Sequence, residues 1–249
     1  MSEIVTKINA SLLLHEHSGG IRFGTDALIL AYFASQGAKK GFCVDLGTGS
    51  GVIPLLLLAT GSRANFKGIE ISPIYALLAK KNSEVNGFGA RFEAVCGNVL
   101  EIDGLVECGS ASAVVTNPPY MPVKSGETSK NSDMSRARRE ENGNIADFCK
   151  SAAYCLKNGG HFYAVYRPDR AAELLCSMRE SGIEPKKIRA VVSYYGARPS
   201  LLLAEGIKSA AEGMIYEKDL CIYADAAHKV YSEEMQEIYR YFSNDNRSE

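Results

Sequence analysis

Several features that mark other classes of protein are missing from this chain of 249 residues. No stretch approaches the roughly 20 apolar residues that a membrane-spanning helix needs. The first residues lack the basic segment and apolar core of a secretory signal. The seven cysteines are odd in number and include no C-x-x-C pair, which argues against a disulfide framework and a zinc site. We therefore predict a cytoplasmic protein without a membrane segment.

The chain also lacks a surplus of positive charge and a set of metal ligands. Its 28 basic residues face 29 acidic ones, giving a net charge of −1, whereas nucleic-acid binders usually show a basic surplus, at least locally. Tight non-specific binding to DNA is therefore not expected, although local basic patches remain open. His15 and His17 have no carboxylate or cysteine partners at metal-binding spacing, so we predict no metal site.

Strands and helices are predicted to alternate along most of the chain, which favours an α/β fold with a parallel sheet covered on both faces. Thr25 or Asp26 can cap a first helix over residues 27–33. A change of pattern near the end predicts an antiparallel hairpin on the sheet edge, and we expect one domain overall, with residues 1–40 as an N-terminal segment that packs on residues 41–249. The expected strands are 41–45, 65–71, 91–95, 112–116, 160–166, 188–195 and 219–223, and the further helices are 52–61, 73–86, 143–157, 169–181 and 232–242.

A glycine-rich loop, D-L-G-T-G-S-G from Asp45 to Gly51, directly follows the first core strand and opens a helix. Such a loop brings backbone close to a small ligand at a helix N-terminus. Its G-x-G-x-G spacing differs from the G-x-G-x-x-G of dinucleotide folds. Asp45 suits the ammonium and sulfonium charges of S-adenosylmethionine better than a pyrophosphate; the alternative is an acid that bonds to loop amides.

Two further residues at predicted strand ends fit the same ligand. Glu70 ends the next strand, where a carboxylate can accept both hydroxyls of a ribose, an arrangement that NAD proteins also use. Asn98 ends the third strand, where it would lie beside an adenine ring or serve as a turn residue after Gly97. Neither residue alone distinguishes the two cofactors.

The tetrad Asn117-Pro118-Pro119-Tyr120 follows the fourth strand and suits the methylation of a conjugated amino nitrogen. The Asn side chain and the first Pro carbonyl can each accept one N–H bond, which favours the pyramidal, nucleophilic form of that nitrogen. The prolines restrict the backbone, and the aromatic ring offers a face on which a base can stack. The alternative is a proline-rich turn, but the upstream glycine loop supplies a methyl donor and makes that alternative improbable.

These motifs together resemble the class I S-adenosylmethionine-dependent methyltransferases that modify exocyclic amino groups, over about residues 20–225. The segments R-F-G-T-D-A and R-P-S-L-L-L-A-E-G-I-K, which begins at Arg198, resemble the bacterial tRNA adenine-N6 methyltransferases, which act on an adenine next to the anticodon of a valine tRNA. Many relatives carry Asp where this chain has Asn98, and an uncharged acceptor should bind adenine more weakly.

The resemblance implies a Rossmann-like, mostly parallel seven-stranded sheet, S-adenosylmethionine as the cofactor and tRNA as the partner. We expect a monomer or weak homodimer. The predicted catalytic residues are Asn117, Pro118, Pro119 and Tyr120. The predicted cofactor-binding residues are Asp45, Gly47, Thr48, Gly49, Glu70, Ile71, Asn98, Val99, Thr25 and Asp26.

A long polar segment, residues 121–142, follows the tetrad and is predicted to be a loop that flanks the substrate base. Its mixed charges also allow a simple solvated loop. The predicted substrate-binding residues are Lys124, Arg136, Arg138 and Arg139 from this loop, together with Lys208.

The prediction of the substrate rests mainly on the short length of chain that is left for a separate recognition domain. Enzymes that read duplex DNA usually need an extra recognition domain, and release-factor glutamine methyltransferases carry a helical domain, whereas 40 residues precede the first core strand here. A splayed base of a structured RNA is the favoured target, with N6-methyladenosine in tRNA as the product. The alternatives are an N5-glutamine protein methyltransferase, an enzyme for rRNA or DNA bases, an enzyme for a small molecule, and a non-catalytic binding module.

Overall fold

The computed structural model describes residues 3–9, 12–18, 23–118 and 143–243. Within these ranges nine strands form one sheet in the order β10-β8-β9-β7-β6-β3-β4-β5, with β11 also paired to β8. The five strands from β5 to β7 are parallel to one another. They are β3 (Phe42–Leu46), β4 (Asn65–Glu70), β5 (Phe92–Cys96), β6 (Ala111–Thr116) and β7 (Leu156–Tyr166). The first four each begin within one residue of the predicted position.

The C-terminal part of the sheet contains an antiparallel hairpin, as predicted. Strands β8 (Ile183–Val192) and β9 (Pro199–Lys208) form a hairpin, and β9 also pairs antiparallel with β7. The predicted strand at 219–223 is not part of this hairpin, because β10 (Ile215–Tyr216) and β11 (Leu220–Cys221) pair parallel with the outer side of β8. The second hairpin strand is therefore the segment that begins at Pro199, whose strand character was not predicted.

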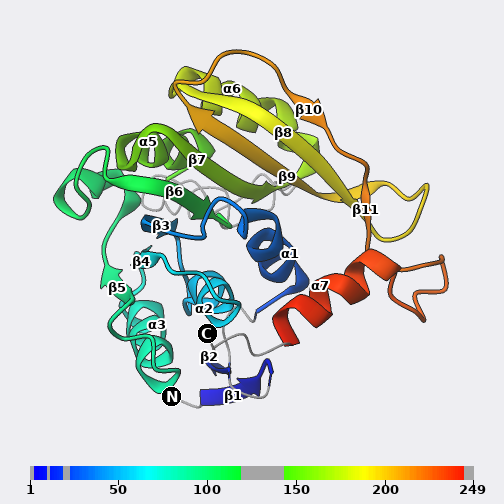
Figure 1. The fold of residues 1–249 in the computed structure, drawn as a ribbon, viewed down its shortest axis with the longest axis horizontal. Coiled ribbons are helices and arrows are strands. Elements are labelled where there is room, and N and C mark those ends of the chain that lie inside the picture. Colours follow the sequence, from blue (N-terminus) through cyan, green and yellow to red (C-terminus); the bar gives the residue numbers. More distant parts are fainter. Residues whose placement is uncertain (1–2, 10–11, 19–22, 119–142, 244–249) are drawn as a thin grey trace, which may run out of the picture.

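Helices cover both faces of the sheet (Figure 1). In the order of the chain, the seven strands from β3 to β9 form a mostly parallel sheet that ends in an antiparallel hairpin, as predicted. One face carries α5 (Ile145–Cys155), α6 (Ala171–Glu180) and the 3-10 turns η1 (Val99–Gly104) and η2 (Pro168–Arg170). The other carries α1 (Thr25–Ala34), α2 (Val52–Ala59), α3 (Pro73–Val85) and α7 (Glu233–Ser243).

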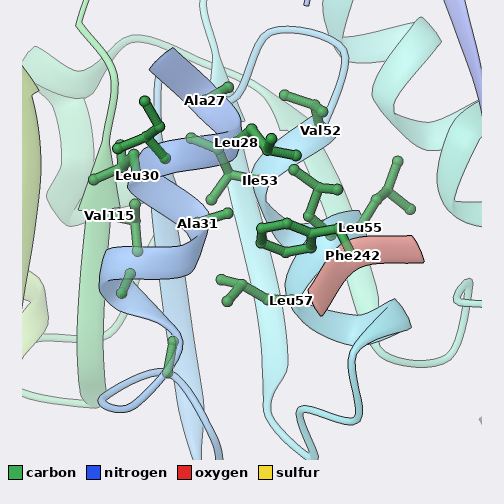
Figure 2. Packing of buried hydrophobic residues seen from close by; sticks show 14 of the residues in the cluster. Ala27, Leu28, Leu30, Ala31, Val52, Ile53, Leu55, Leu57, Val115 and Phe242 are labelled. Atoms are coloured by element: carbon green, nitrogen blue, oxygen red, sulfur yellow. The ribbon is translucent and has the colours of Figure 1, made fainter. Parts of the chain in front are cut away.

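The core on the α1 face is continuous from the first helix to the last. In Figure 2 the apolar side chains of α1 and α2 face one another, Val115 of β6 lies beside α1, and Phe242 of α7 joins the same cluster. Helix α2 is buried at every position from Val52 to Ala59, in keeping with its unbroken apolar sequence. Because α7 packs into this cluster, the C-terminal helix belongs to the core that supports α1.

The N-terminal segment includes a short hairpin of β1 (Glu3–Lys7) and β2 (Leu13–His17), which the sequence did not predict. Two side-chain amides, from Asn82 of α3 and from its C-cap residue Asn86, hold the free edge of β2: the backbone amide of Leu13 donates to Asn86 and that of His15 to Asn82. The predicted division into residues 1–40 and 41–249 stays a prediction. His15 contacts Glu3 rather than a second histidine.

The start of α1 differs from the prediction that Thr25 or Asp26 caps it. Gly24 is the N-cap residue, and no side chain caps the helix. Thr25 and Asp26 instead form its first turn, where a carboxylate interacts favourably with the helix dipole. Among the described residues, no helix is long and apolar enough to cross a membrane.

Candidate functional site

The glycine loop leaves β3 and turns sharply into α2. The amides of Gly47 and Thr48 both donate to the carbonyl of Ile69 on β4, at 2.8 and 3.0 Å. Gly47, Gly49 and Gly51 have φ of 73°, 56° and 82°, a region that other residues rarely adopt. A Cβ on Gly49 would meet nothing within 4 Å, so the backbone at this position borders open space. The loop thus offers bare backbone to a ligand at the carboxyl edge of the sheet.

Asp45 is the most perturbed acid in this part of the molecule. Its side chain is buried, and burial raises its pKa to about 7, opposed by a hydrogen bond from Thr48 and reinforced by the charge of Glu70. The Thr48 hydroxyl donates to one carboxylate oxygen at 2.6 Å. The other oxygen has no hydrogen-bond partner among the described residues, although buried polar atoms nearly always have one. A cationic, hydrogen-donating ligand group would satisfy this oxygen.

Glu70, at the end of β4, is held by backbone amides. Gly49 donates to one carboxylate oxygen and Ser72 to the other, both at 2.9 Å. The carboxylate therefore lies against the glycine loop, as expected of a group that binds the same ligand. Ile71, the next residue, has an exposed side chain.

Asn98 begins η1, and its side chain accepts a hydrogen bond from the amide of Leu100 at 3.0 Å. Asn98 is therefore the N-cap residue of η1, which fits the alternative interpretation of Asn98 as a turn residue. Val99 is buried, and its carbonyl accepts a hydrogen bond from Ser151 of α5. The cofactor roles of Asn98, Val99 and Ile71 stay predictions.

Asn117 and Pro118 continue from β6, next to β3 in the sheet. Leu46 pairs with Thr116, and the Thr116 hydroxyl donates to the Leu46 carbonyl at 2.8 Å. Asn117 and Gly47 are therefore the next residues on two adjacent strands. The Asn117 side-chain nitrogen donates to a carboxylate oxygen of Asp26 at 2.9 Å. Because the nitrogen faces Asp26, the amide oxygen is directed away from it, where it can accept a hydrogen bond.

The structure brings most of the described predicted residues to one edge of the sheet. Asp45, Glu70 and Asn117 lie at the carboxyl ends of three neighbouring parallel strands, where α/β proteins bind ligands. Asp26 joins them through Asn117. The predicted residues Pro119, Tyr120, Lys124, Arg136, Arg138 and Arg139 lie outside the described residues.

Lys208 does not join this group. It ends β9, which runs antiparallel to β7, so it lies at the opposite edge of the sheet. Its ammonium donates to the carbonyls of Ala153 and Leu156 at the C-terminus of α5, at 2.6 and 2.7 Å. A lysine there neutralises the unpaired carbonyls of a helix end. Its role in substrate binding stays a prediction that this position does not support.

The contacts that support these residues were not predicted from the sequence. Thr25 shares a hydrogen bond with Tyr239 of α7, which packs against α1. A Cβ on Gly24 would lie 2.4 Å from an Asp26 carboxylate oxygen, so this glycine leaves room for the acid. The sequence signal for both was the segment R-F-G-T-D-A, although it did not identify the contacts.

Chemically, this edge combines two kinds of group. Around the glycine loop lie a buried acid with one oxygen that has no partner among the described residues, a second acid and exposed backbone. Beside it, the side-chain oxygen of Asn117 and the backbone carbonyl of Pro118 provide hydrogen-bond acceptors. Such a site can hold a cationic cofactor next to a group that presents N–H donors.

Comparison with known proteins gives a consistent result. The model of a family described as "Methyltransferase small domain" matches residues 18–181. A solved structure of a predicted O-methyltransferase from Agrobacterium tumefaciens superposes with a TM-score of 0.71 at 18% identity, covering 88% of this chain and 97% of that one. At this identity the likeness concerns the fold.

Curated relatives are similar over most of the chain. One from Bacteroides thetaiotaomicron is 28% identical over 222 residues, which cover 88% of this chain and 89% of the relative. One from Porphyromonas gingivalis is 27% identical over 190 residues, 74% of each chain. Both are named tRNA1(Val) (adenine(37)-N6)-methyltransferase.

Proposed function

Because the chain belongs to the methyltransferase small domain family, we propose that it transfers a methyl group from S-adenosylmethionine to the N6 amino group of an adenine in tRNA, next to the anticodon. The observation that carries this proposal is the position of Asn117, which follows β6 next to the strand that leads into the glycine loop and whose side-chain nitrogen is taken up by Asp26. Methyl donor and amino acceptor would thus meet between two adjacent strand ends.

The residues of the loop fit the cofactor. When bound, S-adenosylmethionine supplies a methyl group on a positively charged sulfonium. Asp45 offers a buried oxygen without a partner among the described residues, which suits the ammonium group of the cofactor. Glu70 lies against Gly49 at a position where its carboxylate can accept ribose hydroxyls. Thr48 supports Asp45, and the backbone at Gly47 and Gly49 is the surface that the cofactor covers.

Asn117 and Pro118 act on the acceptor. The amide oxygen of Asn117 and the carbonyl of Pro118 each accept one N–H of the target amino group, which concentrates the lone pair on nitrogen. Methylation makes the nitrogen cationic and sharply lowers its pKa, so its proton is lost to water and no strong general base is needed. Pro119 and Tyr120 belong to the same proposed set, with the Tyr120 ring as the face on which adenine stacks.

The choice of tRNA rests on the relatives and on the tetrad. Both relatives carry names that specify adenine 37 of a valine tRNA and its N6 position. An N-P-P-Y sequence suits an amino nitrogen of this kind, and Lys124, Arg136, Arg138 and Arg139 would contact the surrounding RNA phosphates. The proposed enzyme is cytoplasmic, as its substrate is.

Mass spectrometry of nucleosides tests the proposal directly. Purified protein is incubated with isotope-labelled cofactor and unmodified bulk tRNA, and in parallel with rRNA, DNA and a release-factor protein. Labelled N6-methyladenosine in tRNA alone is the expected result. Label in glutamine, guanine or DNA, or in none of the substrates, would refute the assignment to tRNA adenine.

Asn117→Ala tests the chemical role of the acceptor in the same assay. We expect single-turnover methylation to slow by about 100-fold or more, as when one preorganised hydrogen-bonding group is lost from a transition state. Cofactor affinity, measured by calorimetry, should stay within about threefold of wild type. A methylation rate within about threefold of wild type would contradict the role assigned to Asn117.

A further inference from the structure

Asp26 and Asn117 are 91 residues apart in the sequence, yet their side chains meet at the candidate site. The Asn117 nitrogen donates to one Asp26 oxygen at 2.9 Å. Asp26 lies in the first turn of α1, and Asn117 follows the last residue of β6. The contact therefore joins a helix from the N-terminal part of the chain to a strand in the middle of the sheet.

We propose that Asp26 is a positioning residue that sets the orientation of the Asn117 amide. The inference rests on the proposed function for what that orientation achieves: it directs the Asn117 oxygen, rather than its nitrogen, toward the acceptor amino group. Thr25 and Asp26 were predicted to bind the cofactor, and that role stays a prediction; the positioning role of Asp26 rests on its contact with Asn117.

The orientation follows from the chemistry of the two groups. A side-chain amide carries one acceptor oxygen and one donor nitrogen of nearly the same shape, so packing alone does not distinguish its two orientations. An ionised carboxylate only accepts hydrogen bonds. If the Asn117 amide were reversed, its oxygen would face the Asp26 oxygen without a proton between them. Asp26 therefore excludes the orientation in which Asn117 presents N–H groups to an amine.

The carboxylate also changes the strength of the acceptor. Hydrogen bonds that involve an ionised group are roughly twice as strong as neutral ones. Bonds in a chain polarise one another, so a donor engaged by a carboxylate leaves more negative charge on the amide oxygen. That oxygen is the atom that would bind the target N–H group, and Asp26 strengthens it without touching the substrate.

The surroundings hold Asp26 in place. Gly24 provides the space, because a Cβ there would lie 2.4 Å from an Asp26 oxygen. Thr25, the neighbour of Asp26, bonds to Tyr239 of α7. In α1, the residues from Ala27 to Ala31 and Ala34 are buried, and the helix packs against α2 (Figure 2). The first turn is thereby fixed on both sides of Asp26.

Three substitutions separate positioning from a cofactor or folding role. Asp26→Asn keeps the shape but allows both orientations of Asn117, and we expect kcat to fall about fivefold. Asp26→Ala removes the partner, and we expect a fall of about 10- to 100-fold. Glu173→Gln is the matched control: it alters a first-turn acid on α6, paired with Arg170, and should leave kcat unchanged.

A double-mutant cycle tests whether Asp26 acts through Asn117. In an Asn117→Ala background, Asp26→Ala should lower kcat by less than about twofold, because the group that it positions is gone. Affinity for S-adenosylmethionine, measured by calorimetry, should stay within about twofold of wild type in each Asp26 variant. Independent losses that multiply in the double mutant, or weaker cofactor binding with unchanged kcat at saturation, would overturn the inference.

A spectroscopic measurement tests the contact without requiring activity. The Asn117 side-chain NH2 signals are identified as the pair missing from the nitrogen–proton spectrum of Asn117→Ala. In Asp26→Asn, loss of the charged partner should shift the bonded proton upfield, whereas Glu173→Gln should leave it in place. If that proton does not move, the inference fails. If it moves but no tRNA adenine is methylated, the proposed function fails and the positioning contact stands.

Discussion

Asp45 should make the stability of the cofactor-free protein depend on pH in an unusual direction. The perturbation is Asp45→Asn, which keeps the shape of the side chain and an oxygen that can accept from Thr48. In the folded protein burial raises the pKa of Asp45 to about 7, from an ordinary value of 3.8. Between about pH 4 and pH 7, the folded protein therefore keeps a proton on Asp45 that the unfolded protein has released.

The sign and size follow from linkage between protonation and folding. Because the folded pKa is raised, the contribution of Asp45 is most favourable below about pH 4 and is lost as the pH rises through about 7. The difference between the two pKa values corresponds to about 4 kcal/mol. Compared with wild type, Asp45→Asn should therefore gain about 4 kcal/mol in free energy of unfolding between pH 4 and pH 8.

Urea denaturation of both proteins at several pH values measures this difference, since the contributions of the other titratable groups largely cancel. Asp169→Asn serves as a control with the opposite sign: Arg167 lowers the pKa of this exposed acid, so its small contribution is present above its ordinary pKa and lost on acidification. A stability difference for Asp45→Asn that stays constant within about 1 kcal/mol from pH 4 to pH 8 would refute the reasoning.

Two further substitutions test the supporting structure. Lys208→Met should cost about 1.5–3 kcal/mol of stability by removing two charged hydrogen bonds at the end of α5, while the kcat and KM for tRNA remain unchanged; a raised KM with unchanged stability would instead favour RNA contact. Gly68→Ala should cost about 1–3 kcal/mol in urea denaturation, because a Cβ there would lie 2.7–2.9 Å from Thr48 side-chain atoms, and should weaken cofactor binding. Gly89→Ala, where the nearest atom lies at 3.8 Å, is its matched control, and equal losses at both positions would contradict the packing argument.

Strands β3, β4, β5 and β6 were predictable because each is a run of five or six residues with a glycine or proline within three residues of its end. The hairpin was harder: the segment from Pro199 to Lys208 begins with proline and carries charged residues, yet it pairs on both sides. Residues 220–221 have the apolar character of a strand, but they pair parallel with β8. A sequence of two residues does not indicate whether a strand pairs parallel or antiparallel. In both cases the pairing depends on strands that are distant in the sequence.

The candidate site shows the same difference between features with a local sequence signal and features that depend on distant contacts. Asp45, Glu70 and Asn117 could be predicted to lie together because each is at or next to the end of a recognisable strand, and strand ends meet at one edge of a parallel sheet. Their roles in binding and catalysis stay predictions. The partner of Asp26 was not predictable, since that contact depends on how α1 packs. Lys208 lies in a segment with a family resemblance, but the antiparallel direction of its strand carried it to the opposite edge.

The contact between Asp26 and Asn117 has a consequence for the order of events during folding. Closing a loop of 91 residues carries a large entropic cost, and contacts so distant in sequence form slowly. The strands that carry the glycine loop can pair before α1 docks, whereas the Asn117 amide acquires its orientation only afterwards. On refolding from urea, the ability to bind cofactor should therefore return before the ability to transfer a methyl group.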